Sequence, residues 1–179
     1  MENRGPWRRH ATRQLITTPH FTAQRDEVTR PDGARGRYDW VAAPDQIRVA
    51  ALVGDGILVV EQHHYLAGQL WQLPGGSVDP EDAGPRAAAE RELAEETGYR
   101  GGEWHDHGHL YPLPGLTACR VHLWRTTGPL PGPASPEAVE ADLRVRHVPL
   151  AEAVRAVRDG RLRCAPSAAL VLAVSAPQV

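Results

Sequence analysis

Acidic side chains cluster near the middle of the sequence, where together they could hold a metal ion. Glu92, Glu95 and Glu96 lie close together in the chain and follow directly after Arg91. Carboxylates packed so closely repel one another unless a cation lies among them. Oxygen ligands of this kind favour Mg²⁺ or Mn²⁺, which keep several waters and share their remaining positions with phosphates. The residue types and their spacing therefore predict a divalent-metal site that acts on phosphate groups.

A helix must position these acids, and the sequence marks both of its ends. Pro85 suits a first helical turn, where a missing N–H leaves no bond unmade, and Gly98 suits the left-handed position just past a helix end. Glu92 and Glu96 are four residues apart and therefore share one helix face, with Glu95 to one side. The sequence thus predicts one helix that presents the carboxylates together.

A glycine turn, Leu73–Gly76, precedes this helix. Glycine at positions 75 and 76 leaves room for backbone carbonyls to approach whatever the glutamates hold. Arg91 lies four residues before Glu95 and can pair with it or orient it. The alternative is a solvated helix with ion pairs between residues four apart, but the turn ahead of the helix favours the metal site.

The segment resembles the Nudix box. In that pattern a glycine is followed by five residues, Glu, seven residues and then Arg-Glu-apolar-x-Glu-Glu-x-Gly-apolar. Residues 91–99 match the second half in full. Counting from Gly76, the early acid is Asp82, and one residue is inserted in the loop between Asp82 and Pro85. The resemblance implies a Nudix-type α/β/α sandwich with a mixed β-sheet, in agreement with the alternation of strands and helices along the chain.

The resemblance also implies roles for individual residues. A general base is expected in the acidic stretch 137–142, with Glu140 as first candidate and Glu137 as second. A solvated loop is an equal alternative for either acid alone. The expected site residues are the metal ligands Glu92, Glu95, Glu96 and Gly75, the catalytic residues Arg91, Glu92, Glu95 and Glu140, and the substrate-binding residues His64, Gly76 and Trp40.

Segments outside the box are similar to ADP-ribose pyrophosphatases and related nucleotide-sugar hydrolases. They are residues 29–33, 49–53, 59–62 and 110–115. This resemblance implies hydrolysis of the diphosphate bond in a nucleoside diphosphate linked to a sugar or similar group, which releases a nucleoside monophosphate. Three positions depart from the subgroup: His64 replaces its usual Arg, Gln72 its Glu, and Cys119 an acid.

These departures leave two other functions open. The first is a nucleoside triphosphate or oxidised-nucleotide pyrophosphohydrolase of the same family. The second is a nucleotide-sugar sensor without turnover, although a binding module has little reason to keep the intact run 91–96. The resemblance further implies a homodimer in which the N-terminal strands within residues 13–45 take part.

The composition predicts a small soluble enzyme. We expect an irregular, flexible arm at residues 1–12 and a single domain over residues 13–179. The net charge of −2 and the scattered arginines predict no nucleic-acid partner. Apolar runs are too short for a signal peptide or a membrane span. Cys119 and Cys164 lack paired spacing, so the expected location is the cytoplasm.

Hydrophobic periodicity and turn residues predict the remaining elements. Strands are expected at 15–29, 38–41, 47–53, 57–61, 121–125 and 143–148, and helices at 150–159 and 166–175. Turns are expected at 31–33 and, as a hairpin, at 54–56, and the prolines of 128–136 predict a loop. His105, His107 and His109 alternate as metal ligands on a strand would, but a polar strand edge explains them better because no fourth ligand is suitably spaced.

Overall fold

The computed structural model describes residues 2–136 and 138–176, and the chain divides into two compact units. The N-terminal unit runs to Pro44 and includes Leu113–Cys119, and the helix-bearing unit holds Asp45–Pro112 and continues from Arg120. Residues 113–119 join the first unit through hydrogen bonds such as that from the Val41 N–H to the Leu116 carbonyl, 2.8 Å. The single domain expected over residues 13–179 stays a prediction.

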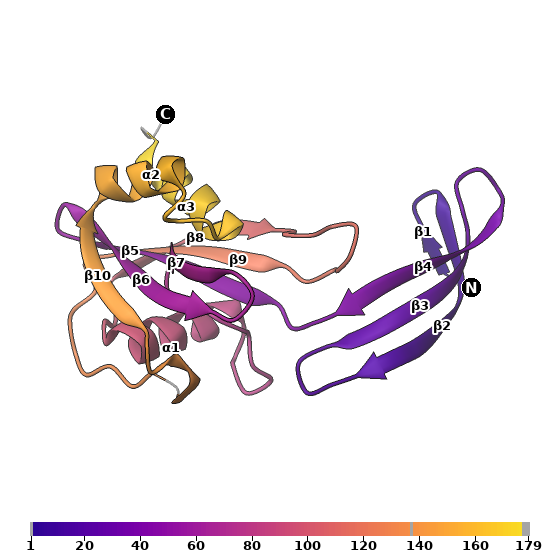
Figure 1. The fold of residues 1–179 in the computed structure, drawn as a ribbon, viewed down its shortest axis with the longest axis horizontal. Coiled ribbons are helices and arrows are strands. Elements are labelled where there is room, and N and C mark those ends of the chain that lie inside the picture. The colour runs from indigo at the N-terminus through magenta and orange to yellow at the C-terminus, as the bar shows by residue number, and fades with distance from the viewer. Residues whose placement is uncertain (1, 137, 177–179) are drawn as a thin grey trace. The chain divides into compact units, whose positions relative to one another are not determined.

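The N-terminal unit is a four-stranded antiparallel sheet whose strands follow chain order. The strands are β1 (Glu2–Arg4), β2 (Trp7–Thr17), β3 (Thr22–Thr29) and β4 (Arg35–Ala42) (Figure 1). The irregular arm predicted for residues 1–12 is therefore wrong. Main-chain pairing to β3 holds this polar segment in a strand, and no apolar pattern is needed for such pairing.

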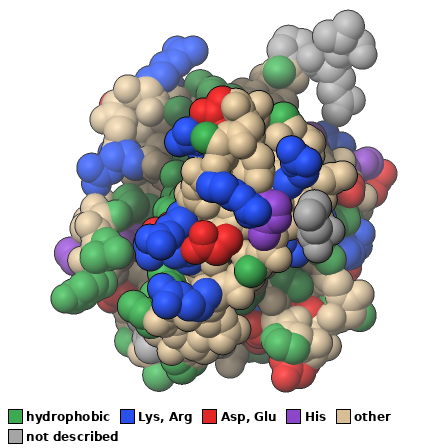
Figure 2. Space-filling model, turned by 90° about the vertical axis from the view of Figure 1, so that its right-hand side faces the viewer, with side chains coloured by type: hydrophobic (Ala, Val, Ile, Leu, Met, Phe, Trp, Pro, Cys, Tyr) green, Lys and Arg blue, Asp and Glu red, His purple; other side chains and the backbone are tan. Residues whose placement is uncertain are grey.

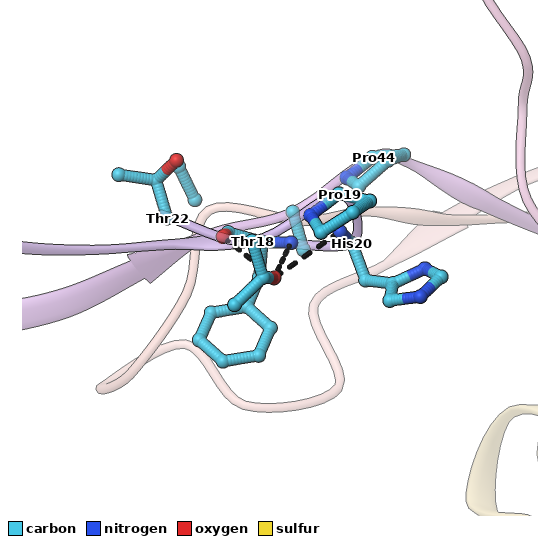
Figure 3. Close-up of a pocket in the computed structure, with 8 residues that line it drawn as sticks. Thr18, Pro19, His20, Thr22 and Pro44 are labelled. Carbon is cyan, nitrogen blue, oxygen red and sulfur yellow. Dashed lines mark hydrogen bonds between the residues drawn. The ribbon is translucent and has the colours of Figure 1, made fainter. Parts of the chain in front are cut away.

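A turn interrupts the strand that we predicted over residues 15–29. The Thr18 hydroxyl accepts the N–H groups of His20 and Phe21 at 3.2 and 3.1 Å, which closes the turn between β2 and β3. A hollow of about 280 Å³ lies beside this turn, lined also by residues 42–44 of the same unit (Figure 3). The turn predicted at 31–33 is confirmed by the bond from the Gly33 N–H to the Arg30 carbonyl.

Several arginines of the N-terminal unit are paired with acids. Arg25 donates two hydrogen bonds of 2.6 Å to the Asp39 carboxylate, and Arg37 lies 3.3 Å from Glu27. On the face that Figure 2 shows, basic and acidic side chains are interspersed. These pairs cancel much of the local charge.

The helix-bearing unit contains a six-stranded mixed sheet in the order β10-β6-β5-β9-β8, with β7 also paired to β6. The strands are β5 (Gln46–Val53), β6 (Gly56–His64), β7 (Gly68–Gln72), β8 (Glu103–Leu110), β9 (Val121–Thr127) and β10 (Arg144–Pro149). Among the strands that the structure describes, β5 and β9 form the one parallel pair. Four predicted strands and the hairpin at 54–56 are confirmed, but β7 was not predicted.

The histidine-rich segment is the edge strand β8, as the polar-edge explanation required. A bulge between Asp106 and His109 breaks the alternation that would have put three histidines on one face. Within the described residues, no three His, Cys, Asp or Glu side chains lie close enough to hold a metal ion.

Helices cover both faces of this sheet (Figure 1). They are α1 (Pro85–Thr97) on one side, and α2 (Leu150–Asp159) and α3 (Ala165–Ser175) on the other. Alternation along β5 separates the layers, because Ile47 and Val49 pack with Leu93 of α1, whereas Ala50 packs with Leu170 of α3. The predicted α/β/α sandwich is confirmed, as are both predicted C-terminal helices.

In the described part of the chain, no helix combines the length and the hydropathy that crossing a bilayer requires. Neither cysteine forms a disulfide; Cys119 is buried and Cys164 is half-buried.

The C-terminal end of α1 depends on Gly98. Its φ of 77° is left-handed, and its N–H donates to the Ala94 carbonyl at 3.0 Å. A β-carbon at this position would lie 2.3 Å from the Gly132 carbonyl oxygen. The helix end and the loop of residues 128–136 therefore pack without room for a side chain.

We expect Gly98→Ala to lower the free energy of unfolding by about 2–4 kcal/mol, since left-handed strain and the clash with Gly132 add. Gly128→Ala is the matched control, because its φ of 68° is also left-handed but no atom lies within 4 Å of the added carbon. It should cost about 1–2 kcal/mol. Urea unfolding measures both, and equal losses would refute the role of the close contact.

Candidate active site

A glycine turn, Leu73–Gly76, is inserted between β5 and β6. The two strands pair only beside their hairpin, and β6 then pairs with β7, which ends where the turn begins. The carbonyls of Pro74 and Gly76 accept the N–H groups of Val49 and Ile47, both at 2.9 Å. The turn is therefore held against β5 in the manner of another strand.

Only glycine fits at the last two positions of this turn, 75 and 76. Gly75 has a φ of 144°, and a β-carbon there would lie 2.3 Å from the Ile47 carbonyl oxygen. At Gly76 a β-carbon would lie 2.4 Å from Oε1 of Glu92. The Gly75 N–H donates to Oε2 of Glu96 at 2.8 Å. The backbone thus lies directly against two glutamates of α1.

Arg91 organises the acids on the more open side of the helix. Its guanidinium donates to both carboxylate oxygens of Asp82, at 3.1 and 2.9 Å, and to Glu92 and Glu95, each at 3.0 Å. It also bonds the Ser77 carbonyl at 3.0 Å. The hydrogen bond from Arg91 holds the pKa of Asp82 below its usual range. Arg91 therefore ties the inserted loop to the helix.

Glu96 is buried and Glu92 is half-buried, and loss of solvent makes both carboxyl groups hard to ionise. Glu96 is 3% exposed, and burial raises its pKa to about 8, with the charges of Glu140 and Glu92 adding to the effect. Burial also raises the pKa of Glu92 to about 7, opposed by Arg91 and aided by Glu95 and Glu140. Four acids thus act on one another in a small volume, so the site favours a bound cation.

The donor set fits a divalent cation. Glu92 and Glu96 are hard oxygen donors, and no described group donates a hydrogen bond to the Gly75 carbonyl, which leaves that oxygen available. The three carboxylates do not yet converge on one metal position, because Arg91 holds those of Glu92 and Glu95. For all three glutamates to bind one cation, the side chains of Glu92 and Glu95 would have to rotate away from Arg91.

The candidate base belongs to the same acid group. Glu140 ends the short 3₁₀ helix η1 (Ala138–Glu140), and its charge acts on both Glu92 and Glu96. Asp142 anchors this segment by accepting the His63 N–H at 3.0 Å. Glu137, the second candidate, lies outside the described residues.

The expected substrate residues fall into different parts of the fold. Gly76 lies in the inserted turn, and His64 ends β6 with its buried Nε2 unpartnered. Trp40 belongs to the N-terminal unit, where the Arg4 guanidinium lies 5.9 Å above its ring. Cys119 belongs to that unit too and donates to the Pro44 carbonyl, whereas Gln72 is buried at the end of β7.

Sequence reasoning missed two residues near the acids. Arg48 projects from β5, and its charge acts on both Glu96 and His64. An arginine inside an otherwise apolar strand was a usable signal, because a charge rarely lies in such a run without a reason. Asp142 offered no local signal, because its partner is the distant His63 backbone.

The sandwich and the acid-bearing helix beneath a glycine turn have the architecture expected of Nudix proteins. A family model described as NUDIX domain matches residues 44–164. The chain is 32% identical to an ADP-ribose pyrophosphatase of Mycobacterium tuberculosis (strain ATCC 25618 / H37Rv), over 90% of this chain and 80% of that protein. The chain therefore belongs to the Nudix family and is a Nudix pyrophosphohydrolase.

Two further proteins show the range of this similarity. A CMP-5'-(N-acetyl-N-hydroxy-3-aminopropyl)phosphonate hydrolase of Streptomyces rubellomurinus (strain ATCC 31215) is 30% identical, over 94% of this chain and 82% of that protein. A crystal structure of an ADP compounds hydrolase matches with a TM-score of 0.83 at 16% identity, over 97% of this chain and 95% of the other. This last likeness concerns the fold.

The raised pKa of Glu96 has a consequence for metal-free protein. The folded state keeps a proton that the unfolded state releases above about pH 4.3, so this contribution to stability is complete below that pH and is lost as the pH rises towards 8. In chelator, we expect the free energy of unfolding to fall between pH 5 and about 8.5 by on the order of 2–4 kcal/mol. Urea unfolding across that range measures it.

Glu96→Gln should reduce this slope, since the amide stays neutral and can still accept the Gly75 N–H, and the raised pKa of Glu92 accounts for the slope that remains. Glu90→Gln is the control on the same helix, because Glu90 is exposed and pairs with Arg86. If both variants kept the wild-type slope, burial of Glu96 would not be its source.

Proposed function

We propose that this protein hydrolyses the diphosphate bond of a nucleoside diphosphate linked to a sugar or a similar group, as in ADP-ribose, and releases a nucleoside monophosphate. Catalysis requires Mg²⁺ or Mn²⁺. The observation that carries the proposal is the pair Glu92 and Glu96, half-buried and buried respectively, which lie against the glycine turn and on which the charge of Glu140 acts.

The donors suit this chemistry. Glu92, Glu96, Glu95 and the Gly75 carbonyl are the proposed metal ligands, and Nudix hydrolases generally use a divalent metal. When bound, the metal neutralises charge on the diphosphate oxygens and lowers the pKa of a coordinated water. Without such a cation the site would bury several acids beside an anionic substrate, and their charges would repel it.

The side chains then divide the remaining tasks. Arg91 holds Glu92 and Glu95 in orientation, and the Gly75 N–H holds Glu96. Glu140 accepts a proton from the water that attacks one phosphorus, and Asp142 fixes the segment that carries Glu140.

The named relatives support the class of substrate. The ADP-ribose pyrophosphatase aligns over nearly the whole chain and favours a sugar beyond the diphosphate. The CMP-phosphonate hydrolase aligns over a similar length and favours a second candidate, a nucleoside monophosphate joined to a group other than a sugar. Both substrates carry a nucleotide on one side of the scissile bond. The homodimer and the cytoplasmic location remain predictions.

Product analysis tests the proposal. With Mg²⁺ or Mn²⁺, we expect ADP-ribose to yield AMP and ribose 5-phosphate, and chelator to abolish turnover. A panel with GDP-mannose, UDP-glucose, FAD, dGTP and 8-oxo-dGTP defines the range of substrates.

Glu96→Gln should lower kcat/KM at least about 100-fold, because it removes a metal ligand, and Glu90→Gln should not. Turnover of triphosphates alone would refute the substrate class, and binding without any turnover would favour a sensor.

The role of Glu140 is tested separately. Glu140→Gln should lower kcat by about 10²–10⁴-fold with little change in KM, since a base acts in the chemical step. Glu81→Gln removes the same charge from an exposed loop residue and serves as the control. An unchanged kcat in Glu140→Gln would exclude it as the base.

A further inference from the structure

Arg48 occupies an unusual position on β5. The N–H groups of the residues on either side of it, Ile47 and Val49, hold the glycine turn. Its guanidinium Nη1 donates to the Ile47 carbonyl at 2.7 Å, the same oxygen that packs against Gly75. Arg48 is therefore fixed directly beside the turn that lies against Glu96.

The charge of this guanidinium is not matched by any acid in contact. Arg48 is half-buried, and among the described residues no carboxylate lies within ion-pair distance of it. Its Nε is buried and has no hydrogen-bond partner among the described residues, and its guanidinium also bonds the side chain of Cys164, whose sulfur is a weak acceptor. A partly buried cation in this condition costs free energy unless something else supplies the anion.

His64 also has a buried nitrogen without a partner. It is the last residue of β6, and its Nε2 makes no hydrogen bond with any described group. Burial lowers the pKa of His64, and the Arg48 charge lowers it further, so its neutral form is favoured. The same Arg48 charge also acts on Glu96. Arg48 and His64 thus each have a buried nitrogen without a partner among the described residues, and the Arg48 charge links them electrostatically to the acid site.

We propose that Arg48 binds a phosphate oxygen of the nucleoside-diphosphate substrate, with the His64 imidazole as a second donor. This inference rests on the proposed function and adds the group that recognises the diphosphate. A planar guanidinium matches phosphate oxygens in a fork, and the bond would supply the missing counter-charge. The remaining acids hold the cation on the other side of the same diphosphate, so substrate charge is balanced from two sides.

The test uses binding without turnover. The probe is α,β-methylene-ADP-ribose, titrated by calorimetry into the full chain with Mg²⁺, and ADP-ribose kinetics run in parallel. Arg48→Gln should weaken binding about 10- to 100-fold and raise KM by a similar factor, with kcat changed less. Arg48→Lys should fall between wild type and Gln, because the point charge remains but the fork is lost.

Arg125→Gln is the matched control. Arg125 lies on the neighbouring strand β9, is half-buried, and also has a buried unpartnered Nε, so its removal changes the net charge equally. Its charge acts on His107 of β8. We expect this variant to bind the probe as wild type does.

The outcomes separate this inference from the proposed function. Probe binding that depends on Arg48 but not Arg125, in a protein that leaves ADP-ribose intact, would support the inference and refute the function. Hydrolysis of ADP-ribose with unchanged probe binding in Arg48→Gln would refute the inference alone.

Equal losses of probe binding in Arg48→Gln and Arg125→Gln would show a general charge effect and would also refute the inference. If wild type did not bind the probe, both would fail. A lowered melting temperature in Arg48→Gln with wild-type KM would assign Arg48 a structural role instead.

Discussion

The site depends on one constraint, the insertion of the Leu73–Gly76 turn between β5 and β6. Because the two strands separate after their hairpin, main-chain donors of β5 are left to bond the turn instead of β6. The turn then lies so close to both β5 and α1 that a β-carbon at Gly75 would meet the Ile47 carbonyl, and one at Gly76 would meet the Glu92 carboxylate. The hydrogen bonds that hold the turn beside β5 therefore also place the backbone of Gly75 and Gly76 against Glu96 and Glu92.

That packing gives the acids different electrostatic environments on one helix. Glu95 is partly exposed and bonds Arg91, so its charge is stabilised within the protein. Glu96 lies beneath the turn, where a single backbone N–H stabilises its carboxylate. Glu92 lies between these extremes, touching Arg91 and the turn. A cation would gain most at Glu96 and would have to compete with Arg91 for the other two.

The parts of this arrangement that sequence reasoning predicted are those with local signals. The helix Pro85–Thr97 was marked by its proline, its spacing and Gly98, and each of these acts within a few residues. The five-residue strand β7 and the Asp142 anchor were missed, because their partners are set by tertiary pairing. The strands at residues 2–4 and 7–12 were missed for the same reason, since polar side chains gave no pattern.

Asp82 and Arg48 show how a site can tolerate departures from a motif. Asp82 has a shorter side chain than glutamate, yet both of its oxygens accept hydrogen bonds from Arg91. Asp82 thereby links the loop to the helix. At the other edge, the pKa of His64 is lowered by burial where the subgroup has a cation, and Arg48 on the adjoining part of the sheet forms no ion pair with a described carboxylate. A charge required by a substrate need not come from one fixed position, provided that another strand brings it to the same place.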